Sequence, residues 1–529
     1  MASSFIFPDW PPHLTDAQQS HLTQVATTYA LAHGLLYLPP SSPSSPTPAP
    51  TSAIHAPLSL FPSPFPRSLF QTALRLQKIY NVLYARIALD EEFLDSVMGE
   101  VAQVDEFTGQ LWRSWKKLRD EGITEACDYH LGIFRSDYLL HAPKDSAELV
   151  SLKQVEFNTI SSSFGALSDR ASSLHNYLLG ATNYFHLSPY ITKENLPPNG
   201  ATSTVVEGLA AAHVAYGVHD AYILFVVQPG ERNVFDQRWL EYELLKRTYR
   251  HNINVIRQTF DDLLTTASLS PSRVLTLRNA LPSSTSESSD AIEISVVYYR
   301  AGYTPKDYPT PSHYALRETL SRSRAINCPT LALQLAGGKK VQQVLTKEGI
   351  LERFLRPPSL PSKHTGAGPN VEAGEFTSED LALIRSTWVD MWCLSDPDGL
   401  THALKHHASL VLKPQREGGG NNIYHSSIPS FLSSLPASAL PAWIAMRLIE
   451  PPQGLGGYLV RAGSGESSAA RKDVVSELGV FGWALFGGPR KVVVRQGDGG
   501  WLVRTKGRES DEGGVAVGFS VLDSVLLVD

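Results

Sequence analysis

The chain has 529 residues, of which 42% are hydrophobic and 19% charged, and its 46 basic residues stand against 52 acidic ones for a formal net charge of −6. This composition is typical of a folded globular protein and excludes a largely disordered one. The small acidic excess also argues against a dedicated nucleic-acid binder, and the length predicts several domains of roughly 150 residues each.

The cysteines are few and widely spaced. Cys127, Cys328 and Cys393 form no CxxC pair and no spacing typical of a metal site. A low, odd count fits a reducing compartment. No apolar run reaches the length of a membrane-spanning helix, and the first residues lack the pattern of a signal peptide. We therefore expect a cytoplasmic protein with neither membrane nor nucleic-acid partners.

Hydrophobic periodicity predicts helices in the first part of the chain. Apolar residues recur at three- and four-residue steps between Leu76 and Ile87, which is typical of a helix with one apolar stripe. A second amphipathic helix is expected over 107–118. A Pro- and Ser-rich stretch at 39–51 precedes both, and its composition predicts a mobile surface loop.

Short β-branched runs then alternate with helical segments. Strands are expected at 221–227, 292–299, 410–412 and 474–475. Farther along, the runs 492–494 and 501–503 flank a Gly-Asp-Gly-Gly sequence at 497–500, which predicts that they pair as a hairpin. The mixture indicates an α/β fold of the mixed α+β type. Small polar stretches at 281–290, 356–379 and 462–472 are further expected surface insertions.

Two segments offer chemistry for a phosphate and a metal ion. Glu156 and Asn158 alternate along a predicted strand and so share a face, where hard oxygen ligands suit Mg²⁺. Lys413 directly follows the run at 410–412 and precedes Glu417 and a glycine-rich stretch. There, backbone N–H groups can approach a phosphate, the lysine can neutralise it and the glutamate can hold a divalent ion. A polar strand edge and a glycine-rich surface turn are the alternative interpretations.

A nearby lysine motif resembles the end of a phosphate-binding P-loop but fails its requirements. Gly338 and Lys339 would need a glycine at 333 and a serine or threonine at 340, where the chain has Leu333 and Lys340. A P-loop nucleoside triphosphatase is therefore rejected, although Lys339 remains a candidate for contact with a phosphate.

Other polar residues follow predicted strands and suit a polar substrate. They comprise the hydroxyls at 161–163, the segment 231–237, Arg300 after the run at 292–299, and Arg504 after the run at 501–503. An arginine at a strand end can bind a carboxylate through two N–H groups. The alternative is that these strand ends are simply solvated.

These strings resemble the family of eukaryotic glutathione synthetases, which are ATP-grasp ligases. The resemblance runs from about Leu131 to Val517. The matching strings occur in the same order as in the family, at Arg135-Ser136-Asp137-Tyr138, 156–165, 231–237, 298–303, 334–343, 413–422, 476–479 and 504–516.

The resemblance implies both a fold and a reaction. The fold would be an ATP-grasp body formed by 1–215 and 336–529, with a lid at about 380–475 and an inserted (permuted) α/β substrate-binding domain at 216–335. The reaction would join γ-glutamylcysteine to glycine with ATP through an acyl phosphate, giving glutathione, ADP and phosphate. The family is typically a homodimer.

The family's pattern also assigns roles to individual residues of this chain. Mg²⁺ would be held by Glu156, Asn158 and Glu417. Arg135, Lys413 and Arg504 would supply the catalytic positive charges. ATP would contact Glu156, Lys339, Lys413, Glu417, Gly418, Gly419, Gly420, Asn421, Asn422, Tyr424, Met446, Arg447, Leu448, Ile449, Glu477, Lys506 and Glu512. The peptide substrate and glycine would contact Arg135, Ile160, Ser161, Ser162, Ser163, Glu231, Arg232, Asn233, Gln237, Arg300, Ala301, Gly302, Tyr303, Arg504, Val515 and Ala516.

Two alternatives stay open beside this interpretation. One is a related ligase that adds another small amino acid such as β-alanine, although the pair Val515-Ala516 resembles the glycine type. The other is a nucleotide-binding homologue that has lost catalysis, although the expected metal ligands and Lys413 are all present.

Overall fold

The computed structural model describes residues 7, 9–41, 48–123, 129–143, 150–246, 253–280, 291–356, 376–415, 421–462, 471–511, 513–515 and 518–529. Its α-helices are α1 (Asp16–Ala32), α2 (Arg67–Leu89), α3 (Glu91–Ala102), α4 (Glu106–Asp120), α5 (Gly165–Thr182), α6 (Ala201–Tyr216), α7 (Val234–Lys246), α8 (Phe260–Thr266), α9 (Pro311–Arg322), α10 (Leu331–Ala336), α11 (Lys339–Leu345), α12 (Ile350–Leu355), α13 (Ser378–Thr387), α14 (Pro397–Lys405) and α15 (Ser427–Ser434). Over these described ranges, no helix is both long and apolar enough to span a membrane.

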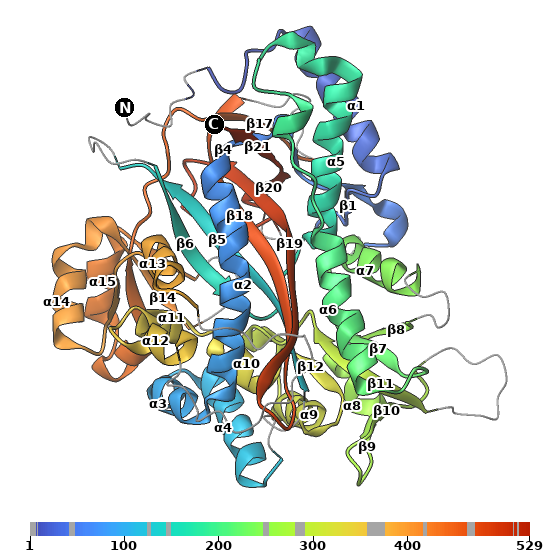
Figure 1. The fold of residues 1–529 in the computed structure, drawn as a ribbon, viewed down its shortest axis with the longest axis vertical. Coiled ribbons are helices and arrows are strands. Elements are labelled where there is room, and N and C mark those ends of the chain that lie inside the picture. Colours follow the sequence, from blue (N-terminus) through green and yellow to red (C-terminus); the bar gives the residue numbers. More distant parts are fainter. Residues whose placement is uncertain are drawn as a thin grey trace.

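A large, mostly antiparallel sheet forms the centre of the molecule (Figure 1). Its strand order is β17 (Gly456–Val460), β3 (Leu58–Ser59), β20 (Ser520–Asp523), β19 (Val492–Gly507), β18 (Arg471–Gly487), β5 (Tyr129–His141) and β6 (Ser151–Asn158). The order mixes strands from both ends of the chain. Residues far apart in sequence are therefore neighbours on this sheet.

Helices cover both faces of the central sheet (Figure 1). On one face, α2 packs against Phe134, Leu478 and Val503. On the other, α5 and α6 pack against residues that alternate with these, such as Phe481 and Leu502. Because successive side chains of a strand point to opposite faces, this alternation identifies the face of every polar residue on the same strands.

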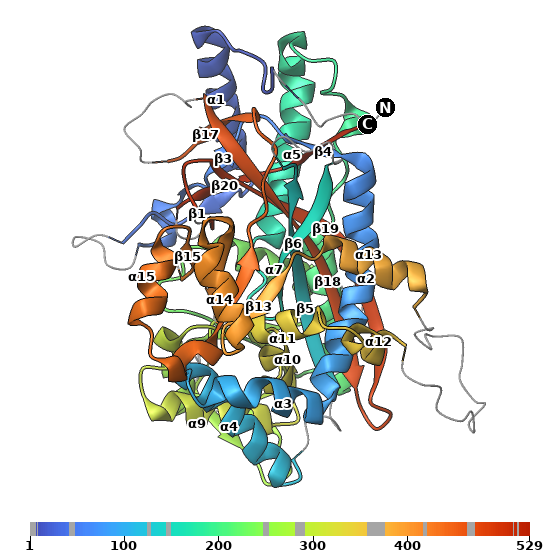
Figure 2. The same cartoon turned by 90° about the vertical axis from the view of Figure 1, so that its left-hand side faces the viewer.

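Two further sheets flank the central one. The first contains β8 (Val255–Gln258), β7 (Tyr222–Val226), β11 (Ile292–Tyr299), β10 (Leu275–Leu277) and β9 (Ala267–Leu269), with β12 (Ile326–Cys328) beside β11. The second contains β13 (Met391–Cys393), β16 (Trp443–Arg447), β14 (Leu410–Pro414) and β15 (Ile423–Tyr424), and lies with α14 and α15 to one side of β5 and β6 (Figure 2). Two short pairs complete the strands, β1 (Leu36–Tyr37) with β2 (Ile54–His55) and β4 (Ser63–Pro66) with β21 (Val525–Val528).

Most predicted elements are confirmed, and one is wrong. The two helices are α2 and α4, and the runs at 221–227, 292–299, 410–412 and 474–475 lie in β7, β11, β14 and β18. The predicted hairpin around 497–500 is instead continuous strand within β19, which pairs with β18 along its length. The reason is packing. Gly500 has φ +75°, and a Cβ there would lie 2.0 Å from the backbone nitrogen of Ala201, so the glycines let the start of α6 approach the strand.

The predicted surface insertions fall mainly on residues that the structure does not describe. All of 281–290 and most of 356–379 and 462–472 lie outside the described residues, as do 42–47 of the first stretch and Cys127. Cys328 and Cys393 are buried and unpaired by disulfide.

Candidate active site

The candidate site begins with a pair of side chains on β5. Arg135 and Asp137 are two residues apart, so they share the face that α5 and α6 cover. The guanidinium donates from Nε and Nη2 to the two oxygens of Asp137 at 2.6 and 2.8 Å. Both residues are buried. On the next strand, Asn158 is the cross-strand partner of Arg135 and donates from Nδ2 to Asp137 at 3.0 Å.

Two lysines from separate elements converge on β6. Lys339, at the start of α11, donates to Glu156 Oε2 at 2.9 Å. Lys413, on β14, donates to the backbone oxygen of Val155 at 3.0 Å. Burial would raise the pKa of Glu156, but the charges of Lys339, Lys413 and then Arg504 hold that pKa well below its ordinary value. Glu156 is therefore a carboxylate at any physiological pH.

Arg504 brings β19 into the same cluster. Its Nη2 donates to Asp137 Oδ2 at 2.9 Å and also to Glu477, its cross-strand partner on β18. Burial raises the pKa of Glu477, and the neighbouring charges of Asp137 and Glu156 add to the rise while Arg504 opposes it. The structure thus brings together the predicted residues Arg135, Glu156, Asn158, Lys339, Lys413, Glu477 and Arg504.

The β13–β16 sheet and the residues next to it carry most of the remaining predicted nucleotide contacts that the structure describes. Met446 and Arg447 are register partners of Val411 and Leu410 on β14, and Leu448 and Ile449 follow β16 directly. Asn422 donates to the hydroxyl of Tyr424 at 3.0 Å, and Asn421 precedes this pair. The predicted residues Glu417, Gly418, Gly419, Gly420, Glu512 and Ala516 lie outside the described residues.

A second polar cluster adjoins the first through the loop after β6. Arg300 donates to the hydroxyl of Ser163, whose backbone oxygen accepts from Arg135 at 3.3 Å. Glu231 accepts from the backbone N–H of Asn233 at 2.8 Å and from Gln237 at 3.1 Å. Burial lowers the pKa of Arg300. The interactions with Tyr298, Asp236 and Glu231 together raise that pKa by a larger amount, so the net shift is upward.

The loop after β11 completes this cluster. The hydroxyl of Tyr303 donates to Gln228 at 3.3 Å, and burial and then Glu231 raise the pKa of Tyr303 to about 12. Gly302 has φ +91° and a backbone N–H that donates to Asp307. Ser161 has a positive φ of 54°, and the hydroxyl of Ser162 donates to the backbone of β5.

Five predicted residues make contacts outside the two clusters. Arg232 donates to the backbone oxygen of Leu38 and stacks on Tyr37. Lys506 donates to the backbone oxygen of Asp511 at 2.7 Å. Ile160 and Ala301 pack in the core on the α2 side, and Val515 packs in the core on the α5 side.

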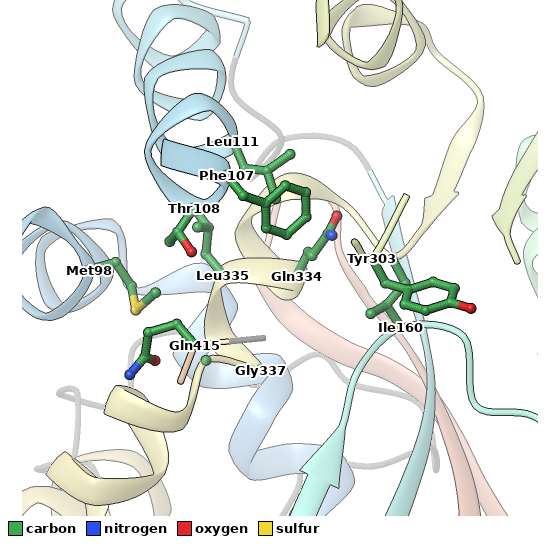
Figure 3. Close-up of a pocket in the computed structure, with 11 residues that line it drawn as sticks. Met98, Phe107, Thr108, Leu111, Ile160, Tyr303, Gln334, Leu335, Gly337 and Gln415 are labelled. Carbon is green, nitrogen blue, oxygen red and sulfur yellow. The ribbon is translucent and has the colours of Figure 1, made fainter. Parts of the chain in front are cut away.

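A small cavity lies beside the second cluster (Figure 3). Its volume is about 30 Å³, and its lining includes Phe107 from α4, Gln334 from α10, Ile160, Tyr303 and Gln415 at the end of β14. A space of this size holds a water molecule or a small side-chain group. ATP is therefore not accommodated there.

Two residues that organise the clusters, Asp137 and Asp236, are not among the predicted site residues. Asp137 links Arg135, Asn158 and Arg504, and its two-residue spacing from Arg135 was the one signal that placed it on the same face. Asp236 accepts from the backbone N–H groups of Phe164, Ala166 and Leu167, and so caps α5 and fixes the loop before it. No pattern in the sequence pairs Asp236 with that helix.

Comparison with known proteins gives a consistent result over nearly the whole chain. The family described as eukaryotic glutathione synthase, ATP binding domain, matches residues 16–527. The glutathione synthetase large chain of Schizosaccharomyces pombe is 35% identical over 97% of this chain and 98% of its own length. Glutathione synthetase of Bos taurus is 36% identical over 97% of this chain and 98% of its own length.

A solved structure supports the fold. The apo form of GSS30, a glutathione synthetase-like effector from Globodera pallida, superposes with a TM-score of 0.72 at 22% identity, over 98% of each chain. The predicted mixed α/β class is confirmed, and the arrangement fits the ATP-grasp fold. The match along the whole chain, at more than a third identity to curated relatives, places it in one family. The chain belongs to the eukaryotic glutathione synthase family.

Proposed function

We propose that this chain joins γ-glutamylcysteine to glycine at the expense of ATP, giving glutathione, ADP and phosphate. Membership of the family supports an ATP-dependent ligase. The geometric observation that carries the proposal is the convergence of Lys339 and Lys413 on consecutive residues of β6. Positive charge from two elements beside a carboxylate suits the terminal phosphates of a nucleotide.

The residues of β6 fit a magnesium ion bound with the nucleotide. Within the described part of the chain, the hydrogen bonds of the Asn158 side chain use Nδ2 and those of Glu156 use Oε2. Asn158 Oδ1 and Glu156 Oε1 are therefore the atoms that we propose as metal ligands. Glu417 is proposed as the third ligand. No group of three or more His, Cys, Asp or Glu side chains suited to a metal occurs among the described residues. When bound, Mg²⁺ would neutralise charge on the transferring phosphate.

The second cluster fits the peptide. Glu231 and Gln237 suit the α-amino group of the glutamyl end, and Arg300 suits its carboxylate. Arg135 and Arg504 would then face the cysteinyl carboxylate that accepts the phosphoryl group, after which the amine of glycine displaces phosphate. The site holds no protein nucleophile in this scheme. Its contribution is orientation and charge stabilisation.

The domain division of the sequence analysis belongs to the same proposal. The β7–β12 sheet supports a substrate-binding domain at 216–335 within a body formed by 1–215 and 336–529. The β13–β16 sheet supports a lid at about 380–475 that would exclude water from the acyl phosphate. A homodimer and a cytoplasmic location are also proposed, and sedimentation of the purified chain would test the dimer.

Phosphate release tests the reaction against its alternatives. The chain would be given Mg·ATP and γ-glutamylcysteine with glycine, with β-alanine or with no acceptor, and glutathione would be identified by mass spectrometry. We expect release only with the dipeptide, and faster release with glycine than with β-alanine. Equal release without the dipeptide would contradict any ligase, and no release at all would favour the inactive homologue.

A further inference from the structure

Asp137 holds together side chains from three strands. It lies on β5 and has no exposed surface. Arg135 donates to both of its oxygens, Arg504 donates from β19 at 2.9 Å, and Asn158 donates from β6 at 3.0 Å. Every one of these donors belongs to a residue that the proposed function places at the reacting groups.

The neighbouring strand leaves room for this arrangement. Gly479 on β18 is the cross-strand partner of Asp137. A Cβ at Gly479 would lie 2.8 Å from Asp137 Oδ1 and 2.9 Å from Arg135 Cδ. The absence of a side chain at this position therefore lets the carboxylate and the guanidinium lie flat against the sheet.

The contacts to Asp137 also decide which N–H groups the arginines have left. Arg135 uses Nε and Nη2, and its Nη1 reaches the backbone oxygen of Ser163. Arg504 uses only Nη2, on Asp137 and Glu477, so its Nε and Nη1 donate to nothing within the described residues. The side chain of Arg504 as a whole is 16% exposed.

We propose that Asp137 is a positioning residue for the ligase reaction. It fixes the two guanidinium groups so that their remaining N–H donors face the substrate carboxylate and the transferring phosphoryl group. Through Asn158 Nδ2 it also turns the amide oxygen toward the metal. The inference rests on the proposed function, because Asp137 itself contacts no substrate and acts only through residues that the proposed function places at the reacting groups. The physical basis is preorganisation, since donors that are already oriented need no rearrangement as charge develops.

A double-mutant cycle separates positioning from a merely structural role. The variants are Asp137→Asn, Arg504→Gln and the two combined, assayed in the full chain for glutathione formation from ATP, γ-glutamylcysteine and glycine. We expect Asp137→Asn to lower kcat about 100-fold, the order of an oriented donor. We also expect the fold-loss of kcat in the double variant to be at least tenfold smaller than the product of the two single fold-losses. Losses that simply multiply would overturn the proposal.

Asp523→Asn is the matched control. Asp523 is another buried carboxylate of the central sheet, but its side-chain donors are the hydroxyls of Ser63 and Thr505 rather than arginines. We expect its kcat to stay within about twofold of wild type, because it orients no group at the site. A loss equal to that of Asp137→Asn would make the effect generic to buried carboxylates and overturn the proposal.

A second variant covers the case in which Asp137→Asn does not fold. Gly479→Ala would push on the Asp137 carboxylate without changing its charge, and we expect a loss of kcat that is again non-additive with Arg504→Gln. If Gly479→Ala kept the wild-type kcat, the positioning role of Asp137 would be overturned and the proposed function would stand. A wild-type chain that makes no glutathione would instead overturn the proposed function and this inference together, so the two failures are distinguishable.

Discussion

Glu156 is the residue on which the electrostatics of the site depend most. Its carboxylate would be expensive to bury alone, but Lys339 and Lys413 approach it from two elements and Arg504 lies within electrostatic range. A neutral side chain there would leave these cations without their shared counter-charge. It would also remove one of the oxygens proposed for the metal.

Glu156→Gln tests this residue directly. Because Gln keeps the shape but not the charge, we expect kcat to fall by about 100-fold or more and the dependence on Mg²⁺ to weaken. The measurement is phosphate release against Mg²⁺ concentration. Asp95→Asn, which breaks a surface pair with Lys116 on α4, is the control and should behave as wild type. An unchanged Mg²⁺ profile at Glu156→Gln would contradict the metal assignment.

Individual site residues could be predicted from their own strings, but their partners could not. Glu156 and Asn158 follow from alternation along one strand, and Lys413 from its place before the glycine-rich stretch. The contact between Asp137 and Arg504 joins residues 367 positions apart. It depends on the strand order β19-β18-β5, which chain order does not dictate and which no local pattern encodes.

At the scale of single elements, β19 shows how packing overrides a local turn signal. A Gly-Asp-Gly-Gly sequence favours a turn by itself. Here the pairing with β18 continues through Gly497 and Asp498, with an irregularity in register near Gly482. The tight approach of α6 requires glycine at 500. The glycines can be seen in the sequence, but the tertiary contact with α6 that requires glycine at 500 cannot.

Gly500→Ala tests this explanation. The new Cβ would meet the backbone of Ala201 at a positive φ, so we expect a loss of about 2–4 kcal/mol in the free energy of unfolding. Denaturant unfolding measures it. Gly180→Ala, at an exposed position in the last turn of α5 with no atom within 4 Å of the new Cβ, should be neutral or stabilising by up to about 1 kcal/mol. Equal stability of the two variants would refute the packing argument.

Across the whole molecule, Asp523 couples the stability of the central sheet to pH. It is buried between β20, β19 and β4, and burial raises its pKa from 3.8 to about 7. Because the folded pKa is the higher one, the folded chain binds more protons than the unfolded chain between these values. The contribution of Asp523 to stability is therefore complete below pH 3.8 and declines as the pH rises through 7.

The expected consequence is that, between pH 5 and pH 8, the free energy of unfolding changes by about 2–3 kcal/mol less favourably in wild type than in Asp523→Asn. Urea unfolding of both chains at the two pH values measures it. His175, which contacts Ser524, has a pKa lowered by burial to about 4 and acts in the opposite sense. Because His175 is present in both chains, the difference between them isolates Asp523, and identical pH profiles would show that Asp523 does not titrate as expected.

The central claim is that β6 and the two converging lysines hold the metal-bound phosphates of ATP. A crystal structure with Mg²⁺ and a non-hydrolysable ATP analogue tests it most directly. The account predicts Mg²⁺ at about 2.0–2.1 Å from oxygens of Glu156 and Asn158, with the phosphates against Lys339 and Lys413. A nucleotide bound away from β6, or a metal that Glu156 does not ligate, would contradict it.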